Sequence, residues 1–484
     1  MALSLASTRT GIHSLKFNAA FLVFSRTMEK ALRFVYLMFL ARLLSPEALG
    51  LYNYGLAWYL IFLPLVCWGL GELLAIYLGR KPKNAEEIIG ATLSIRLVTT
   101  IVFSSLCLMA GLLFNQDPLS KWVIGILVFA LIGRSFAMWG RACFIAVEMS
   151  HYSAFLEIGF RFAEVTAGMT YLLFNQDILV LCAIHSAFWI LEGAVAVSLA
   201  RKKLNFRKIH VPWTVARTYT LQALPIAINI FVLIAFSQCG FVVLKYLADD
   251  AHALGLYTVA FQLVVNTVLI TEAFGQAALP ILSRADDRGS GEQMLFLEAM
   301  LKTCLLFSAA LICLVVVYGR SAIQLLFGSA YADASDALLI CTVSMAAYYA
   351  LPFANEVLRA GFKLVPMTIN ISMAMAVNLT VSIALVPSLG EKAPALGLAA
   401  GSIVALCLHI FTIHRTIRPI SWWGSLFKPM LILVFSVLAT LAIKPNGAIS
   451  VAVGLTVLLA ATAAFRVFTP REAESFLRLL PRSR

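Results

Sequence analysis

Ionisable side chains recur inside long apolar stretches of this 484-residue chain. Such a group costs about 2.5–3.5 kcal/mol at the centre of a membrane helix on insertion scales, so it usually faces a polar cavity or a partner. Arginine suits phosphate oxygens, because the planar guanidinium donates two parallel hydrogen bonds. The basic side chains that we single out for an anionic phosphate group are Arg26, Lys30, Arg33, Arg96, Arg134 and Arg161.

Helical spacing places several of these charges on shared faces. Residues three or four apart lie on the same side of a helix, about one turn from each other. The two charged stripes are Arg26, Glu29, Lys30 and Arg33 in one apolar stretch, and Glu157, Arg161 and Glu164 in another. Each stripe indicates a helix face that is turned away from lipid.

Four arginines are predicted to lie at one depth. With a rise of about 1.5 Å per residue, Arg26, Arg96 and Arg161 lie roughly 12–14 Å from the starts of their predicted helices. Arg134, counted from the opposite end of its helix, reaches the same half of the membrane at roughly 20 Å. The spacing therefore predicts a cationic pocket in the first half of the chain.

A purely structural interpretation competes with this pocket. The carboxylates of the two stripes would pair with Arg33 and Arg161, and the charges would then lock the helices together. The expected pairs are Glu29 with Arg33, and Glu157 and Glu164 with Arg161. Arg26, Arg96 and Arg134 remain the strongest candidates for an anion, since their own helices offer few partners.

The elements that must position these side chains are membrane-spanning helices. The chain is 61% hydrophobic and 13% charged, with a mean hydropathy of +0.91, whereas soluble domains carry about 25% charged residues. Its apolar stretches mostly exceed the ~20 residues that span a bilayer. We expect an all-α polytopic membrane protein with about 14 transmembrane helices. The predicted spans are 17–44, 50–79, 88–114, 121–147, 152–174, 178–200, 218–246, 254–282, 295–318, 336–358, 364–387, 395–414, 427–443 and 447–468.

Basic residues between the spans set the expected orientation. With the N-terminus in the cytoplasm, Lys and Arg number 23 in the cytoplasmic segments and 6 on the opposite side. This bias follows the positive-inside rule and predicts that both termini are cytoplasmic. The net charge of +13 therefore needs no nucleic-acid partner.

An internal repeat predicts two related halves. The pentapeptide ALGLY occurs at residues 48–52 and 253–257, each time after a short polar link and at the start of an apolar stretch. An even number of predicted helices separates the copies, which indicates a parallel repeat about an axis normal to the membrane. The predicted parts are an N-terminal six-helix lobe (1–200), a basic cytoplasmic link (201–217), a second six-helix lobe (218–418), and two extra helices with a tail (419–484).

The sequence carries no enzyme motif that we recognise. The loops are too short for a catalytic domain, and Walker A, HExxH and GxSxG patterns are absent. The nine cysteines lie in apolar stretches without a CxxC pair, so we expect reduced structural thiols and no metal site. No small-residue cleavage site follows the first apolar stretch, so no signal peptide is expected. His185 and His409 are interpreted as packed polar residues rather than as ligands.

Three passages resemble the polysaccharide-biosynthesis (O-antigen and exopolysaccharide) flippases of the multidrug/oligosaccharidyl-lipid/polysaccharide exporter superfamily. The segment LARLLSPEALGLYNYGLAW at Leu40–Trp58 is similar to the joint after the first helix in that family. LLFGSAY at 325–331 resembles the loop after the ninth helix, and ALGLAA at 395–400 resembles the opening of the twelfth. The order of these passages, together with the repeat, extends the resemblance over most of the chain.

The resemblance implies two helical lobes around a central cavity and transport by alternating access. The implied substrate is a polyprenyl-pyrophosphate-linked oligosaccharide, moved from the cytoplasmic to the periplasmic leaflet of a bacterial inner membrane for polysaccharide or lipopolysaccharide synthesis. A polysaccharide polymerase would be a partner, alongside membrane lipids. No cofactor is expected, although a proton or sodium gradient could drive transport. The candidate coupling residues are Glu72, Glu192, Glu272 and Glu356.

Three other functions remain open at this point. A cation-coupled multidrug exporter of the same superfamily would need an anionic or aromatic cavity, whereas the buried charge of the first lobe leans positive. A membrane glycosyltransferase or polymerase would need a long outward loop with catalytic carboxylates, and only Glu47, Asp249 and Asp250 lie near that side. A scaffold without transport gives no reason for a layer of buried arginine.

Overall fold

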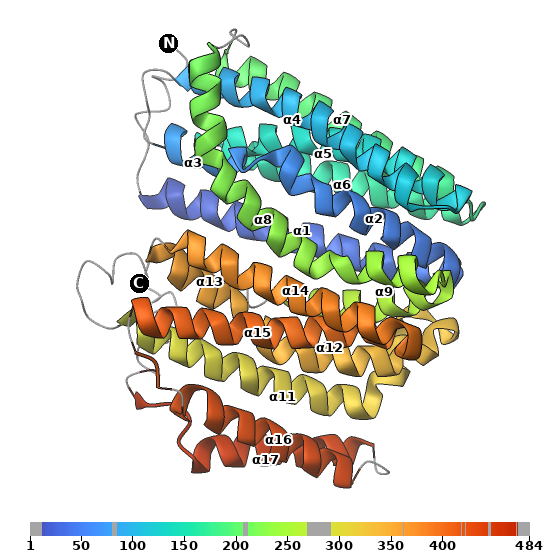
Figure 1. The fold of residues 1–484 in the computed structure, drawn as a ribbon, viewed down its shortest axis with the longest axis vertical. Coiled ribbons are helices and arrows are strands. Elements are labelled where there is room, and N and C mark those ends of the chain that lie inside the picture. Colours follow the sequence, from blue (N-terminus) through green and yellow to red (C-terminus); the bar gives the residue numbers. More distant parts are fainter. Residues whose placement is uncertain are drawn as a thin grey trace. The chain divides into compact units, whose positions relative to one another are not determined.

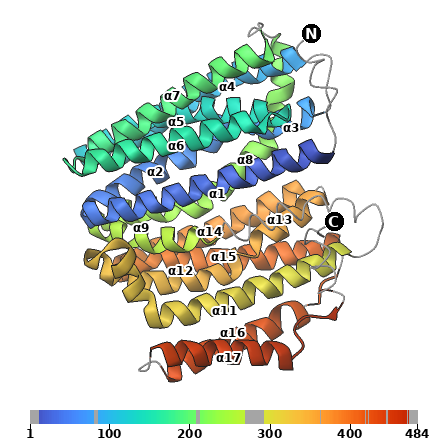
Figure 2. The same ribbon diagram turned by 180° about the vertical axis from the view of Figure 1, so that it is seen from behind.

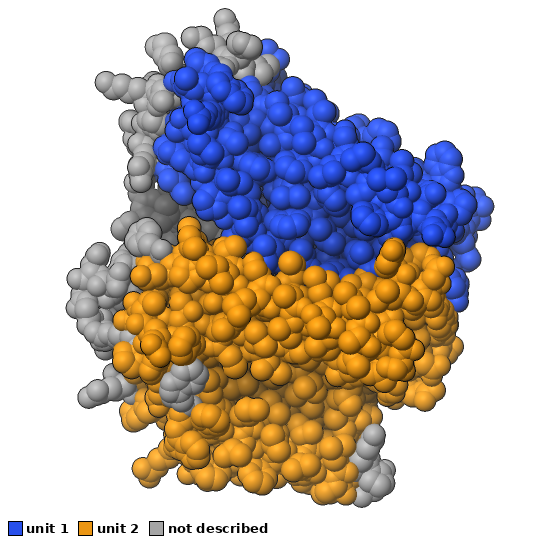
Figure 3. Space-filling model, viewed as in Figure 1, with its two compact units in different colours: residues 1–242 blue, residues 243–484 orange. Residues whose placement is uncertain are grey.

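The computed structural model describes residues 12–79, 85–206, 212–268, 292–361, 363–417, 419–421, 423–443, 447–470 and 472. Over these ranges the chain is helical and contains no strand, as predicted. It separates into two compact units, Met1–Val242 and Val243–Arg484, which Figure 3 colours separately. The finer lobe boundaries expected from the sequence, with residues 201–217 as a link, stay a prediction.

Unit 1 contains seven helices in its described part and most of an eighth (Figures 1 and 2). They are α1 (Ile12–Leu43), α2 (Pro46–Cys67), α3 (Leu70–Leu78), α4 (Ala85–Phe114), α5 (Pro118–Ala146), α6 (Ser150–Leu172), α7 (Ile178–Leu204) and α8 (Trp213–Ala248). Helix α5 packs along α7, and α1 packs along α6. Helix α8 gives its residues up to Val242 to this unit.

Unit 2 repeats the all-helical plan and adds a final pair of helices. Its elements are α9 (Ala251–Val265), α11 (Glu292–Phe327), the short helix η2 (Ser329–Ala334), α12 (Ser335–Tyr348), α13 (Leu351–Ala360), α14 (Leu364–Leu389), α15 (Lys392–Thr416), the short helix η3 (Trp423–Phe427), α16 (Lys428–Ala442) and α17 (Ala448–Ala464). Helices α14 and α15 pack side by side, as do α16 and α17 (Figure 1).

Ten helical stretches of the described part are long and apolar enough to cross a membrane. Helices α1 and α6 do not satisfy this composition test, because each carries the charged stripe that the sequence indicated. Helices α9 and α17 are apolar but shorter. Each predicted span overlaps at least one helix of the described part, and the two charged helices are the exceptions in composition.

Two predicted spans are interrupted. The span at 50–79 breaks between α2 and α3, where Trp68 and Gly69 both adopt left-handed backbone angles, with φ of 51° and 63°. A Cβ on Gly69 would lie 3.0 Å from the Ala223 carbonyl oxygen of α8, so glycine fits this contact. The span at 336–358 is divided into α12 and α13, and the span at 254–282 leaves the described residues after 268.

The two ALGLY copies have the same local structure. Each opens a helix whose first amides are capped by the preceding polar residue. The Ser45 hydroxyl accepts from the Ala48 amide at 3.4 Å, and the Asp250 carboxylate accepts from the His252 amide at 2.8 Å. The leucines, glycine and tyrosine of both copies are buried, which explains why each half keeps this segment.

Glycines bring α5 and α7 into backbone contact. A Cβ on Gly133 would lie 2.4 Å from the Trp189 carbonyl carbon, and one on Gly193 would lie 2.5 Å from the Gly133 carbonyl oxygen. Small residues allow membrane helices to approach this closely. Because the contact fixes the register of the two helices, it places Arg134 of α5 beside Trp189 of α7.

Candidate functional site

Trp189 lies at the centre of a charge cluster in unit 1. The Arg161 guanidinium carbon lies 4.1 Å from the centroid of the Trp189 ring, and that of Arg134 lies 4.8 Å from it. The indole is 1% exposed. Guanidinium groups within about 6 Å of an aromatic face are attracted by the negative potential of the ring. The ring therefore holds two arginines from two different helices, α5 and α6.

A directional chain of hydrogen bonds leads away from Arg134. The Arg134 side chain donates to the Tyr59 hydroxyl at 2.8 Å, and that hydroxyl lies 3.2 Å from His185 Nε2. The Nδ1 atom of His185 lies 2.6 Å from the Glu164 carboxylate. Because a carboxylate only accepts, Nδ1 carries the proton and Nε2 accepts from Tyr59. The packed histidine expected from the sequence is therefore a link between two charged groups.

Ion pairs connect the remaining charged residues of the cluster. Arg161 pairs with Glu164 and also lies 3.9 Å from Glu192. Arg141 lies 3.7 Å from the second oxygen of Glu192 and 2.7 Å from Glu157. The predicted pairing of Arg161 with Glu164 is thus present, whereas Glu157 pairs with Arg141 instead, because that guanidinium lies closer.

Arg134 differs from the other arginines of the cluster in its partners. Arg141 and Arg161 each face two carboxylates, so their charge is neutralised within the protein. In the described part of the chain, the contacts of Arg134 are the Tyr59 hydroxyl and the rings of Tyr59 and Trp189. Its side chain is also only half-buried. Arg134 is therefore the cation of this cluster that is best able to take an anion.

Several polar atoms of the cluster lack hydrogen-bond partners among the described residues. They are both carboxylate oxygens of Glu192, Nε of Arg134, Nε of Arg161 and Nε1 of Trp189. Glu192 is fully buried, and its contacts with the two arginines are longer than hydrogen bonds. A buried carboxylate held this loosely is costly, so it is the group most easily altered by a change of protonation or of nearby charge.

Helix α1 contributes the remaining charges of the first stripe. Arg33 and Glu29 form the predicted i,i+4 pair at 3.5 Å. Arg26 is exposed and Lys30 is half-buried. Helix α1 is held against α6 by a close contact, since a Cβ on Gly168 would overlap the Tyr36 hydroxyl. Helices α1 and α6, which carry the two predicted stripes, therefore pack side by side.

Arg96 lies outside this cluster. It is 1% exposed, and it donates to the Val66 carbonyl oxygen at 3.3 Å, at the broken end of α2. Thr99 donates to the same oxygen at 2.8 Å. A cation at a helix C-terminus stabilises carbonyls that have no partner in the helix. The structure therefore gives Arg96 a capping position that the depth calculation did not anticipate.

The other predicted coupling carboxylates have different surroundings. Glu72 is exposed on α3, and Glu356 of α13 lies 3.2 Å from Arg359. Glu272 lies outside the described residues. Of the candidates that can be placed, Glu192 is the one that is fully buried and joined to the arginine cluster. Which of them couples an ion stays a prediction.

Sequence reasoning missed the aromatic members of the site. Tyr59 and Trp189 connect the charged groups, and neither was singled out as functional. A usable signal existed, because His185, Trp189 and Glu192 follow one another at four- and three-residue steps on one face of α7. Within the described ranges, no group of three or more His, Cys, Asp or Glu side chains could hold a metal ion, and the nine cysteines are free.

Comparison with known proteins places the chain in a family. The model of the family described as polysaccharide biosynthesis protein matches residues 15–286. No curated protein sequence matches the chain. A structure described as the lipid II flippase MurJ in an inward closed conformation aligns with a TM-score of 0.72 and 12% identity, covering 91% of this chain and 98% of that one.

Structures described as multidrug transporters also share the fold. An inward-facing multidrug resistance MATE family transporter of the MOP superfamily aligns with a TM-score of 0.60 and 14% identity, covering 79% of this chain and 92% of that one. The Vibrio cholerae MATE transporter VcmN gives 0.53 and 13%, with 85% and 98% covered. At such identities these structures establish the fold alone. The family match spans more than half of the 484 residues, and the chain therefore belongs to the polysaccharide biosynthesis protein family.

Proposed function

We propose that the chain is a flippase that moves polyprenyl-pyrophosphate-linked oligosaccharide from the cytoplasmic to the periplasmic leaflet. The proposal is supported by the family to which the chain belongs and by its fold, which it shares with a structure described as a lipid II flippase. The substrate combines an apolar tail with an anionic pyrophosphate. A protein that moves it therefore needs a cation inside the membrane whose charge is not already neutralised.

The observation that carries the proposal is the position of Arg134. No carboxylate of the described residues lies within ion-pair distance of this membrane arginine, and the Tyr59 hydroxyl and the Trp189 ring orient it. We infer that Arg134 binds the pyrophosphate. Arg161, Arg33, Lys30 and Arg26 would add positive potential around it, whereas Arg96 would act through the α2 terminus.

The driving force is proposed to act through Glu192. Its oxygens face two arginines without a hydrogen bond, so uptake of a proton or of a sodium ion would change the balance of charge beside Arg161. A pyrophosphate bound at Arg134 would be sensitive to that change because Trp189 contacts both arginines. Flipping should then depend on a gradient in the wild-type protein and lose that dependence in Glu192→Gln.

Flipping in reconstituted vesicles tests the proposal. Purified protein would be supplied with a fluorescent polyprenyl-pyrophosphate oligosaccharide, and protection of the sugar from an external glycosidase would be followed with time. Arg134→Met should weaken the apparent affinity about 10- to 100-fold, because a hydrogen bond to a charged group contributes about 1.5–3 kcal/mol. Wild-type vesicles should be measured with and without proton and sodium gradients.

Arg415→Met is the matched control for this experiment. Arg415 is exposed at the end of α15, where its guanidinium lies 5.0 Å from the Phe411 ring, so this change removes an arginine–aromatic contact outside the site. It should leave the affinity unchanged. Equal movement in protein-containing and protein-free vesicles would contradict the flippase proposal. Full affinity in Arg134→Met would contradict the role of Arg134 and leave the proposed function intact.

The shared fold of the MATE transporters keeps multidrug export as the second candidate. An exporter of cationic drugs would have to bind them beside Arg134, where like charges repel. Accumulation of a cationic dye in cells with and without the protein separates the two functions, since a flippase should not change it.

The same proposal gives the cellular setting. The chain is a multi-pass membrane protein by its helices and its fold. We propose the cytoplasmic membrane of a bacterium, with both termini in the cytoplasm, and a polysaccharide polymerase that receives the flipped units. Cysteine labelling of residues added at either terminus, from each side of the membrane, would test the orientation.

A further inference from the structure

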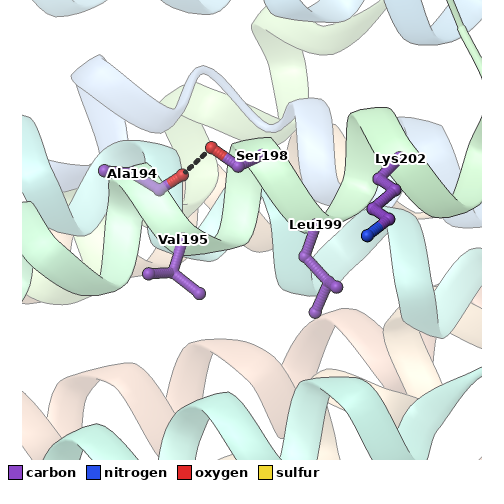
Figure 4. Close-up of a pocket in the computed structure, with 5 residues that line it drawn as sticks. All are labelled: Ala194, Val195, Ser198, Leu199 and Lys202. Carbon is purple, nitrogen blue, oxygen red and sulfur yellow. Dashed lines mark hydrogen bonds between the residues drawn. The ribbon is translucent and has the colours of Figure 1, made fainter.

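A groove runs along the exposed face of α7, away from the charge cluster. It has a volume of about 340 Å³ and is lined by Ala194, Val195, Ser198, Leu199 and Lys202 (Figure 4). These residues recur at steps of three and four, so they form one stripe of the helix. Glu192 and Gly193 of the same helix are buried, whereas Ala194 and Val195 are exposed. The groove and the proposed transport site therefore use different faces of α7.

The wall of the groove is apolar and open. Val195 is 42% exposed, and Leu199 lies beside it in Figure 4. The one hydroxyl of the stripe is satisfied within the helix, since Ser198 donates to the Ala194 carbonyl oxygen at 2.7 Å. Two small residues between larger ones produce the depression. An exposed apolar face of a membrane helix meets the acyl chains of the bilayer, and a depression in it fits one chain.

A basic group closes one end of the groove. Lys202 is exposed, and no hydrogen bond or ion pair joins it to another residue that the structure describes. Its neighbours Arg201 and Lys203 are also basic, and the Lys203 ammonium lies 5.2 Å from the centroid of the Tyr152 ring. Lys203 is thus directed toward α6, which leaves Lys202 as the cation at the groove. A lysine beside an apolar wall can place its stem on the wall and its ammonium at a headgroup.

We propose that this groove binds one anionic phospholipid of the surrounding bilayer. The acyl chain lies along Ala194, Val195 and Leu199, and the headgroup phosphate contacts Lys202. The basic residues at the end of α7 favour an anionic headgroup over a zwitterionic one. A second copy of the chain is a poorer occupant, because a stable protein interface buries more than about 1,000 Å² and this groove belongs to a single helix.

The test measures lipid binding to the full-length protein in detergent by native mass spectrometry. Phosphatidylglycerol and phosphatidylcholine would be titrated in parallel. Phosphatidylglycerol should bind in one saturable step, and Lys202→Ala should weaken that step about fivefold. Val195→Trp should abolish it, because the indole fills the groove. The matched control, Lys121→Ala at the start of α5, should leave the affinity unchanged.

Competition identifies the occupant. Equal affinity for the two lipids, or phosphatidylglycerol binding that neither variant weakens, would overturn the proposal. Displacement by inorganic phosphate alone would also overturn it, since the site would then recognise an anion without a chain. Displacement by the fluorescent polyprenyl-pyrophosphate oligosaccharide at equal concentration would assign the groove to the transported substrate. If Lys202→Ala does not fold, Lys202→Arg, which keeps the charge, and Val195→Trp still decide the outcome.

Discussion

The interiors of the two units differ in how their polar side chains are paired. Unit 1 uses ion pairs, and unit 2 uses mainly neutral hydrogen bonds. In the described part of unit 1, two arginines and three glutamates on α5, α6 and α7 form a continuous network through Glu192. The described part of unit 2 contains neutral hydrogen-bonded pairs. His409 contacts the Asn355 side chain at 2.9 Å, and Thr267 hydrogen-bonds to Tyr349.

Among the described residues of unit 2, one ion pair is fully buried, and it lies at the end of the chain. Lys302 of α11 lies 2.6 Å from Glu472, which follows α17 and also accepts from the Thr469 amide at 2.7 Å. This pair fastens the end of the chain to α11 rather than connecting the helices of the repeat. The repeat thus preserves helix order and capping, while buried charge is concentrated in one half. This difference is what the proposed pyrophosphate site in unit 1 rests on.

The largest effect should come from breaking the network of unit 1. Arg161→Met leaves Glu164 and Glu192 with less compensation, and removal of one partner of a buried ion pair costs about 3–5 kcal/mol. The unfolding midpoint of the purified protein in detergent should fall accordingly. Arg161→Lys keeps the charge and should recover part of the loss. An unchanged midpoint in Arg161→Met would show that the network does not support the packing of unit 1.

A smaller effect is expected for the ion pair of unit 2. Lys302→Met leaves the Glu472 carboxylate without its cation, at a cost of about 1–3 kcal/mol, because the terminal segment can move into water to relieve it. Limited proteolysis should then release the residues after α17. Lys302→Met combined with Glu472→Leu should restore resistance, since two apolar groups replace the pair. Equal resistance of all forms to proteolysis would contradict the role of this ion pair in holding the end of the chain on α11.

The smallest effect should be found for a neutral pair of unit 2. A double-mutant cycle with His409→Leu and Asn355→Leu should give a coupling of about 0.6 kcal/mol, the average for hydrogen bonds between membrane helices. The same unfolding assay measures it. A coupling as large as the loss in Arg161→Met would contradict the contrast between the two units.

The helices could be predicted from the sequence because the length of each apolar stretch determines them. Apolar stretches long enough to span a bilayer must be helical, since every backbone amide needs a partner there. The breaks were harder to predict. The interruption at Trp68 and Gly69 depends on contacts with α4 and α8, which are distant in sequence, and Trp68 is a poor candidate for a left-handed angle.

The site was predicted only in part, because spacing along one helix does not show which helices pack together. Periodicity identified the charged stripes, and two of the expected pairs, Glu29 with Arg33 and Glu164 with Arg161, are confirmed. Depth alone could not separate Arg96 from Arg134, because the residue count predicts a similar level for both. Only the packing of α5 on α7 through Gly133 shows which arginine reaches Trp189.

The broken helix α2–α3 has a consequence for the stage of synthesis at which unit 1 can complete its packing. The Val66 carbonyl receives its donors from Arg96 and Thr99, which leave the ribosome shortly after it. The Trp68 indole donates to the Thr220 carbonyl oxygen at 3.1 Å, 152 residues later, and Gly69 packs on Ala223 beside it. A nascent chain that stops before α8 lacks these contacts. Unit 1 therefore completes its packing only when its last helix enters the membrane.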